Sequence, residues 1–369
     1  MGLNCGIVGL PNVGKSTLFQ ALTQAPAEAA NYPFCTIEPN IGIVEVPDHR
    51  LQKITELIKP QKKIPAVVEF VDIAGLVKGA SKGEGLGNQF LGHIRQVGAI
   101  CHVVRCFDDE NVVHVEGGVD PQRDIETINI ELCLADLETV TKRLAGLDKF
   151  LKSQDKKVSE RAKIAKPILQ NLAAILEEGK PARSLNLDEE ELKAIADLHL
   201  ITLKKVLYVC NVDEASLSDS NQYVQVVEKI AAEEGSQVIR ICCQLEAEIA
   251  ALSDEQERNE FMESIGLQES GLSRLVRAGF ELLNLHTYFT AGEKEVRAWT
   301  FPAGSKAPEC AGIIHTDFER GFIKAEIYHC EDLFEHKSET KIKEAGKVRM
   351  EGKEYLVKDG DVIHFRFNV

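Results

Sequence analysis

The sequence has no long apolar segment and no mark of an exported protein. None of its 369 residues lies in a stretch of the roughly 18 uninterrupted apolar residues that a membrane-spanning helix needs. The N-terminal segment MGLNCGIVGLPNVGKS has no basic lead-in and no small-residue cleavage site, so we expect no signal peptide. With 44% hydrophobic residues, the chain has enough apolar side chains for two or three packed domains. We therefore expect a cytoplasmic protein that makes no membrane contact.

Paired cysteine motifs and a net positive charge are also missing. None of the ten cysteines forms a Cys-x-x-Cys pair with the spacing of a zinc site, and several lie in apolar runs. This pattern favours reduced, mostly buried thiols over a disulfide scaffold. Because the formal net charge is −15, any contact with nucleic acid must come from a local cluster of Lys and Arg.

A phosphate-binding motif is present near the N-terminus. An apolar segment at residues 3–8 is followed by GLPNVGKS, which fits the pattern G-x-x-x-x-G-K-[ST] from Gly9 to Ser16. The two glycines let the loop curl so that backbone N–H groups point at phosphate oxygens, and the segment STLFQALTQA predicts a helix whose N-terminus attracts anions. Lys15 is expected to contact the β- and γ-phosphates. The predicted nucleotide-binding residues here are Asn12, Val13, Gly14, Lys15, Ser16 and Thr17.

A magnesium site is predicted around the Ser16 hydroxyl. The segment AVVEFVDIAG places Asp72 after an apolar strand and Gly75 three residues later, an order typical of a Mg-dependent hydrolase. Asp72 is expected to hold Mg²⁺ through water, and the Gly75 N–H to contact the γ-phosphate. Thr36 is the only Ser or Thr in residues 24–54, so it is the candidate loop hydroxyl that completes the Mg²⁺ shell. A plain loop threonine is the alternative.

The residue that usually orients the attacking water is missing. Small GTPases of the Ras type carry a Gln just after Asp-x-x-Gly, whereas Leu76 stands here and cannot bond water. His114 is the candidate replacement, because it lies in the loop DDENVVHVEGGVDP at the expected nucleotide-facing end of a parallel sheet. A loop histidine without chemistry is the alternative. His114, Lys15 and Thr36 form the predicted catalytic set, while His102, inside the preceding strand, is predicted to be a core residue.

The tetrad NVDE, at residues 211–214, lies where a base-reading motif is expected. Typical GTPases bind guanine there with Asn-Lys-x-Asp, whose carboxylate accepts from guanine's N1–H and amine. Here Asn211 is kept, Val212 replaces the Lys, and the carboxylate is displaced on Glu214. Asn211 could pair bidentately with N6 and N7 of adenine, so the tetrad predicts that ATP is bound in preference to GTP. After the next strand, the base edge is expected to contact the backbone of Cys242, Cys243 and Gln244.

The remainder of the chain predicts two further modules. Strand signals stop between about residues 123 and 203, and two apolar stripes at helical spacing predict an antiparallel helical hairpin. The stripes are Ile130, Leu134, Leu137, Leu144 and Leu151, then Ile164, Ile168, Leu172 and Ile175. From about residue 283, short alternating strands are divided by Gly, Pro and Asp-Gly turns.

Basic residues gather around the predicted turn of the hairpin, with few acids between them. In an acidic protein this local excess predicts a contact with RNA phosphate, and a solvated helix face is the alternative. The cluster consists of Lys142, Arg143, Lys149, Lys152, Lys156, Lys157, Arg161, Lys163 and Lys166.

Together these motifs resemble one family of P-loop NTPases. GLPNVGKST, Thr36, DIAGLVKGAS, a hydrophobic residue in place of the catalytic Gln, and Asn-x-x-Glu look like the YchF subfamily of Obg-like ATPases, in the translation-factor class, over essentially the whole chain. The resemblance implies ATP hydrolysis with Mg²⁺, association with ribosomes at the large subunit, and a catalytic histidine at His114. Asn12 resembles the position that recruits a monovalent cation in some relatives, so K⁺ is a further candidate cofactor.

We therefore predict an α/β fold with three domains. A P-loop NTPase domain with a mostly parallel sheet is expected at residues 1–127 and 204–280, a helical, coiled-coil-like insertion at 128–203, and a C-terminal β-grasp TGS domain at 281–369. The predicted function is that of a ribosome-associated, Mg-dependent ATPase that acts on translation as a switch. One alternative is a GTPase of the same fold that prefers GTP. The other is a ribosome or RNA adaptor whose conformation is set by nucleotide.

Overall fold

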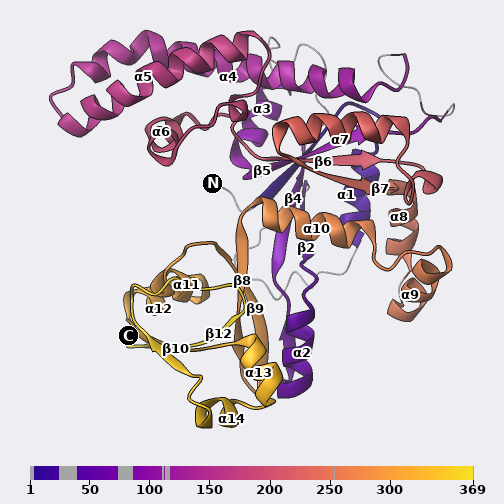
Figure 1. Ribbon diagram of the computed structural model, residues 1–369, viewed down its shortest axis with the longest axis vertical. Helices are drawn as coiled ribbons and strands as arrows, with labels where there is room; N and C mark the ends of the chain where they lie inside the picture. The colour runs from indigo at the N-terminus through magenta and orange to yellow at the C-terminus, as the bar shows by residue number, and fades with distance from the viewer. Residues whose placement is uncertain are drawn as a thin grey trace. The chain divides into compact units, whose positions relative to one another are not determined.

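The computed structural model describes residues 4–24, 40–73, 86–109, 112, 117–252 and 254–368, which form two compact units (Figure 1). The first unit contains residues 4–24, 40–42 and the described residues of 70–272, and the second contains 43–69 and 273–368. The described residues form two six-stranded sheets.

The sheet of the first unit has the strand order β2-β4-β1-β5-β6-β7, and β1, β5, β6 and β7 are paired in parallel, as predicted. Every residue of β5 and β6 is buried, because helices cover both faces of a central parallel strand. The strands are β1 Asn4–Val8, β2 Ile41–Glu45, β4 Val67–Asp72, β5 Ala99–Arg105, β6 Val206–Asn211 and β7 Gln237–Ile241.

Strand order reverses between β1 and β5, which are neighbours in the sheet although β2 and β4 intervene in the sequence. In open parallel sheets, ligands bind outside the carboxyl ends of the strands at such a reversal. The fold therefore directs a ligand to the loops that follow β1 and β5.

The helices of the first unit lie between and after its strands, with α4, α5 and α6 all between β5 and β6. They are α1 Lys15–Gln24, α3 Leu86–Gln96, α4 Pro121–Leu151, α5 Lys156–Glu177, α6 Glu189–Ile195, α7 Gln222–Glu234, α8 Cys243–Ala251 and α9 Glu255–Ser264. Three short 3₁₀ segments are η2 Ala182–Ser184, η3 Ala196–Leu198 and η4 Glu214–Ser216. Helix α10, Gly271–Leu282, begins where this unit ends.

Helices α4 and α5 lie side by side as a hairpin (Figure 1). Asp120 caps α4 by accepting from the Arg123 N–H, and the helix then continues for 31 residues, so the predicted boundary at residues 127–128 falls inside it. The stripe on α5 packs against α4, with Ile168 and Leu172 buried. Ile130 is 48% exposed, so the predicted seam is wrong at this residue. Helix α4 also contacts β5 and α7, so its packing is not confined to the seam with α5.

A buried carboxylate fixes the return of the chain to the sheet. Asp136 of α4 is fully buried and accepts from the backbone N–H groups of Ile201 and Thr202, at 2.9 and 2.7 Å, and from the Thr202 hydroxyl. Burial raises the pKa of Asp136, while these hydrogen bonds oppose that shift. The segment after α6 is therefore held on α4 before it enters β6.

The second unit is built on a sheet of order β11-β10-β12-β8-β9-β3. Its core contains Tyr288, Phe301, Ile327 and Ile363. The strands are β3 Lys62–Ile64, β8 Leu285–Ala291, β9 Glu295–Pro302, β10 Phe322–His329, β11 Arg349–Glu351 and β12 Asp361–Phe367. The helices are α2 His49–Ile58, α11 Ala307–Ile314, α12 Thr316–Arg320, α13 Cys330–His336 and α14 Glu339–Glu344.

One strand of the second sheet comes from an unexpected part of the sequence. β3 pairs in parallel with β9, so residues 62–64 join this sheet, whereas the predicted domain limits group them with the P-loop domain. A strand of three residues carries too little periodicity to be recognised in sequence. In the described part of the chain, no helix combines the length and the apolar character needed to cross a membrane.

His102 lies in the middle of β5 and is a core residue, as predicted. Its side chain is 3% exposed, and its ring lies 5.5 Å from the Tyr208 ring of β6. Burial lowers the pKa of His102 to about 3, and the positive charges of Arg183 and Lys15 act in the same direction. The imidazole is therefore neutral in the folded chain at neutral pH.

This pKa shift predicts a pH-dependent loss of stability. The unfolded chain protonates His102 below about pH 6.5 while the folded chain does not, so stability falls as pH drops through the window from about 6.5 to 3. Between pH 7 and pH 5 the loss from this group is about 2 kcal/mol. His102→Gln removes it, and urea unfolding at the two pH values measures the difference. His49→Gln, at an exposed histidine, is the control and should keep the full loss. Equal losses in the two variants would contradict the assignment.

Candidate functional site

The loop between β1 and α1 has the backbone that a phosphate-binding loop requires. A Cβ at Gly9 would lie 2.5 Å from the carbonyl oxygen of Val103 in β5. Gly14 has a φ of +102°, and a Cβ there would collide with the side-chain nitrogen of Asn211. Both glycines of the motif are therefore required by close approach as well as by conformation. The helix starts at once, with the Leu18 N–H donating to the Gly14 carbonyl at 2.9 Å.

Lys15 is buried at the first residue of α1, with 7% of its surface exposed. Its Nζ donates to the backbone carbonyl of Leu10 at 2.7 Å, so the ammonium is folded back across the loop. Burial lowers the pKa of Lys15 to about 8, and the charge of Asp72 opposes this shift. The ammonium remains charged at neutral pH. A phosphate oxygen can replace the Leu10 carbonyl as its acceptor without moving the helix.

The charge of Asp72, at the end of β4, acts on this cation. Burial raises the pKa of Asp72, and the charge of Lys15 opposes the rise. Ser16, the next residue of α1, is exposed and lines the same pocket as Lys15. Within the described residues, no group of three or more His, Cys, Asp or Glu could hold a metal ion. A hydroxyl and one carboxylate fit Mg²⁺ instead, because this ion keeps its waters and takes nucleotide phosphates as further ligands.

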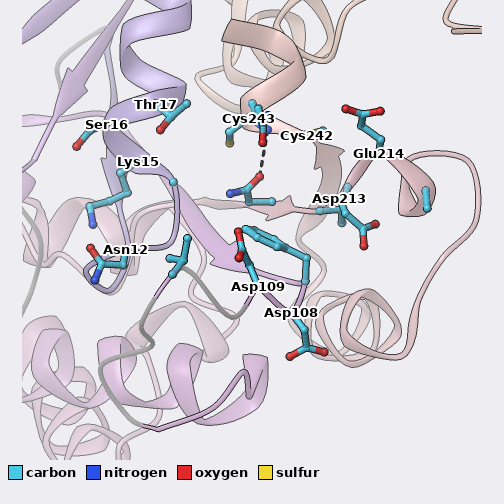
Figure 2. Close-up of a pocket in the computed structure, with 17 residues that line it drawn as sticks. Asn12, Lys15, Ser16, Thr17, Asp108, Asp109, Asp213, Glu214, Cys242 and Cys243 are labelled. Atoms are coloured by element: carbon cyan, nitrogen blue, oxygen red, sulfur yellow. Dashed lines mark hydrogen bonds between the residues drawn. The ribbon is translucent and has the colours of Figure 1, made fainter. Parts of the chain in front are cut away.

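Asn211, at the end of β6, is buried and both of its polar side-chain atoms are in use. Nδ2 donates to the Val13 carbonyl of the phosphate-binding loop at 2.9 Å, and Oδ1 accepts from the Cys243 N–H at 3.1 Å (Figure 2, dashed line for the second bond). The amide thus joins β6, the loop after β1 and the first residue of α8. Each bond uses one of the two N–H donors and one of the two acceptor lone pairs of the amide, so the predicted bidentate pairing of Asn211 with adenine stays a prediction.

The predicted residues of the two motifs meet in one pocket of ≈ 760 Å³. Figure 2 shows Asn12, Lys15, Ser16 and Thr17 on one side of it and Asp213 and Glu214 on the other. Of the predicted nucleotide-binding residues, the pocket is lined by Asn12, Gly14, Lys15, Ser16, Thr17, Asn211, Glu214, Cys242, Cys243 and Gln244. Val13 is buried behind the loop and contributes its carbonyl to Asn211.

A second wall of the pocket was not predicted. It follows β5 and consists of Phe107, Asp108, Asp109 and Val112. The rule that ligands bind after the carboxyl ends of parallel strands, which pointed to His114, also applies to the first residues after β5 and could have predicted this wall. Asp213 also lines the pocket, and its carboxylate caps η4 by accepting from the Ser216 N–H at 2.9 Å.

Several predicted site residues lie outside the described residues. They are Thr36, Gly75 and His114, together with Leu76 at the position of the missing Gln. Their roles stay predictions.

Three features define the class of P-loop nucleoside triphosphatases, and all three are present here. They are a strand, a glycine-rich loop that closes on a buried lysine, and an acidic residue at the end of a neighbouring strand. Two family models match the chain: MMR_HSR1, described as "50S ribosome-binding GTPase", over residues 4–143, and YchF-GTPase_C, described as "Protein of unknown function (DUF933)", over residues 285–368.

Curated relatives and a solved structure narrow the class to a family. The chain is 60% identical to the Ribosome-binding ATPase YchF of Bacillus subtilis (strain 168) and 56% identical to that of Escherichia coli O157:H7, each over 100% of both chains. It is similar to the solved Schizosaccharomyces pombe YchF GTPase, with a TM-score of 0.88 and 41% identity, covering 99% of this chain and 97% of that one. The chain belongs to the YchF family, and the resemblance in its motifs is confirmed.

The two bonds of Asn211 predict how its loss alters binding. Asn211→Ala leaves the Val13 carbonyl and the Cys243 N–H without their partner, so it should weaken ATP and GTP alike. We expect both Kd values to rise roughly 30-fold, about 2 kcal/mol, with their ratio unchanged. Isothermal titration with each Mg-nucleotide measures this.

Asn171→Ala, the same change at an exposed site on α5, is the matched control and should leave both Kd values as they are. If Asn211→Ala weakened ATP selectively, the amide would contact adenine as first predicted from the sequence.

Proposed function

We propose that this chain is a ribosome-associated, Mg-dependent ATPase that acts on translation as a nucleotide-controlled switch. The observation that carries the proposal is a single pocket that joins the buried Lys15 to the Asn211–Glu214 tetrad. The names of the curated relatives, which are ribosome-binding ATPases, support the same activity and partner. A cytoplasmic location agrees with that partner and with the free, buried state of the described cysteines.

At the phosphate end, the residues of the chain bind and neutralise charge. Lys15 exchanges the Leu10 carbonyl for β- and γ-phosphate oxygens. Ser16 and Asp72 would hold Mg²⁺, which supplies charge neutralisation between the phosphates when bound. Thr36 is proposed to complete the metal shell, Gly75 to contact the γ-phosphate and His114 to orient the attacking water. Asn12, whose φ is +60° at the top of the loop, is the proposed contact for K⁺.

At the base end, the geometry disfavours guanine. Val212 is 2% exposed and cannot lie over the base as the stem of a Lys would. Asp213 is committed to capping η4, and Glu214 stands exposed at the rim. Guanine's N1–H and amine therefore meet no carboxylate that is held in place for them. Adenine has neither of these donors, so the missing carboxylate does not weaken ATP binding. This supports ATP as the preferred nucleotide and GTP as the weaker one.

The proposed ribosomal contact is the large subunit, and the family model that matches residues 4–143 supports it by its description. Two arginines of the basic hairpin cluster have a structural role, since Arg143 and Arg161 both donate to Asp197 at 2.5 Å. The exposed lysines at the hairpin turn remain available for RNA phosphate: Lys149, Lys152, Lys156 and Lys157. The unit with residues 273–368 is proposed to be a TGS module that offers a second RNA contact.

The ATPase proposal is tested with Lys15→Ala. This variant should lower kcat/KM for ATP at least 100-fold, about 2.7 kcal/mol, because the cation on the transferred phosphate is gone. Phosphate release measures turnover, and titration of the parent protein should give an ATP Kd at least tenfold below that for GTP. Lys205→Ala, at an exposed lysine of the same unit, should leave turnover unchanged. A parent protein that prefers GTP would favour the GTPase alternative, and one that binds neither nucleotide would refute the proposal.

The RNA contact is tested by reversing charge at the hairpin turn. Replacing Lys149, Lys152, Lys156 and Lys157 by Glu should weaken binding to large ribosomal subunits by at least tenfold and flatten its salt dependence, with ATP turnover unchanged. Co-sedimentation across a salt series measures this. A control with the same charge change at Lys180, Lys193, Lys205 and Lys229 should bind as the parent does. Equal losses in the two variants would mean that net charge, not the hairpin, determines binding.

A further inference from the structure

Arg105, the last residue of β5, is buried, and no ion pair joins it to another of the described residues. Arg105 is only 2% exposed, and its side-chain hydrogen bonds to the described residues go to backbone carbonyls. A buried guanidinium needs polar partners to offset the loss of water. Those partners show what the residue does.

Three backbone carbonyls converge on this guanidinium. Nε donates to the Phe107 carbonyl at 3.1 Å, one terminal nitrogen to the Val112 carbonyl at 2.8 Å, and the other to the Asp109 carbonyl at 3.1 Å. The guanidinium carbon also lies 4.8 Å from the centroid of the Phe107 ring. One side chain thus holds both the backbone of this segment and its aromatic ring.

The carbonyls that Arg105 holds belong to the wall of the nucleotide pocket that follows β5. Phe107, Asp109 and Val112 all line that pocket, whereas Arg105 does not and stands behind them. Three carbonyl dipoles that point at one place repel each other unless a cation lies there. The shape of this wall therefore depends on the charge and on the forked geometry of the guanidinium.

The wall lies beside the base-reading tetrad. Arg105 is the register partner of Asn211 in the sheet, and the Cys106 N–H donates to the Asn211 carbonyl at 2.8 Å. In Figure 2, Asp108 and Asp109 lie toward Asp213 rather than beside Ser16. The outer side of the wall is tied to α7, where Asn221 donates to the Cys106 carbonyl and Tyr223 to Asp108.

We propose that Arg105 is a positioning residue for the nucleoside end of the pocket. By binding three carbonyls, it positions the wall of Phe107, Asp108, Asp109 and Val112, against which the base and ribose bind. The proposal rests on the ATPase function proposed above. It concerns the nucleoside half of the ligand, because the phosphate half is held by the loop after β1 and by Lys15.

The test compares Arg105→Lys with the parent in two measurements. Lysine keeps the charge but has no fork to reach three carbonyls. Amide hydrogen exchange of residues 106–112 should become at least tenfold faster while residues 9–18 exchange as before. The Kd for Mg-ATP should rise at least tenfold, whereas the Kd for inorganic tripolyphosphate, measured by displacement of a fluorescent ATP analogue, should stay within twofold.

Arg183→Lys is the matched control. Arg183 is a half-buried arginine of the same unit, but it pairs with Glu234 at 3.0 Å and is not among the residues lining the pocket. It should leave the exchange of residues 106–112 and both Kd values as in the parent. Unchanged exchange of this segment in Arg105→Lys, or equal losses of ATP and tripolyphosphate binding, would overturn the proposal. If the parent bound no ATP, the proposed function would fail, and the exchange measurement alone would decide whether Arg105 orders the wall.

Discussion

The nucleotide pocket depends on one buried amide. Asn211, at the end of β6, bonds both the phosphate-binding loop and the first residue of α8 through a single side chain. The absence of a Cβ at Gly14 lets the amide approach so closely. The two ends of the pocket are therefore coupled. A movement of the Val13 carbonyl shifts the Asn211 amide and, through it, the Cys243 N–H, and a movement of Cys243 acts on Val13 in the same way. The Asn of the tetrad therefore serves the architecture of the site before it serves recognition.

Two buried cations flank this amide, and both rest on backbone carbonyls rather than on carboxylates. Lys15 has one such acceptor, Leu10, and a pKa of about 8 leaves it charged at neutral pH. Arg105 has three acceptors in fixed directions. One acceptor is easily exchanged for a phosphate oxygen, whereas three are not. A hydrogen bond from a cation to a backbone carbonyl thus has two uses. Lys15 can exchange its carbonyl for a ligand oxygen, whereas Arg105 keeps its three carbonyls and fixes the wall of the pocket.

The phosphate-binding loop, the parallel sheet and the hairpin were predictable because short-range sequence rules determine them. The G-x-x-x-x-G-K-[ST] pattern specifies a backbone path, and apolar periodicity specifies α5. The roles of Asn211 and Arg105 were not predictable, because they follow from tertiary approach. Val13 is 198 positions away from Asn211 in the sequence. Arg105 ends an apolar strand and gives no sign there that the chain folds back over it.

The errors in the sequence-based prediction have the same origin. Ile130 fits the helical seam, yet it is 48% exposed, and α4 also contacts β5 and α7 in packing that periodicity alone does not record. The pairing of β3 with β9 joins residues more than 200 positions apart through three residues, which no local pattern records.

The unbroken length of α4 has a mechanical consequence. It runs for 31 residues from its cap at Asp120, next to the loop after β5, to the turn of the hairpin. At about 1.5 Å per residue, the last residue of α4 lies about 45 Å from its first turn. A rotation of the helix by about 5° about its first turn therefore displaces the last residue by about 4 Å. A small shift of the first turn of α4 is therefore enlarged along the helix and moves the turn of the hairpin by about the width of a side chain.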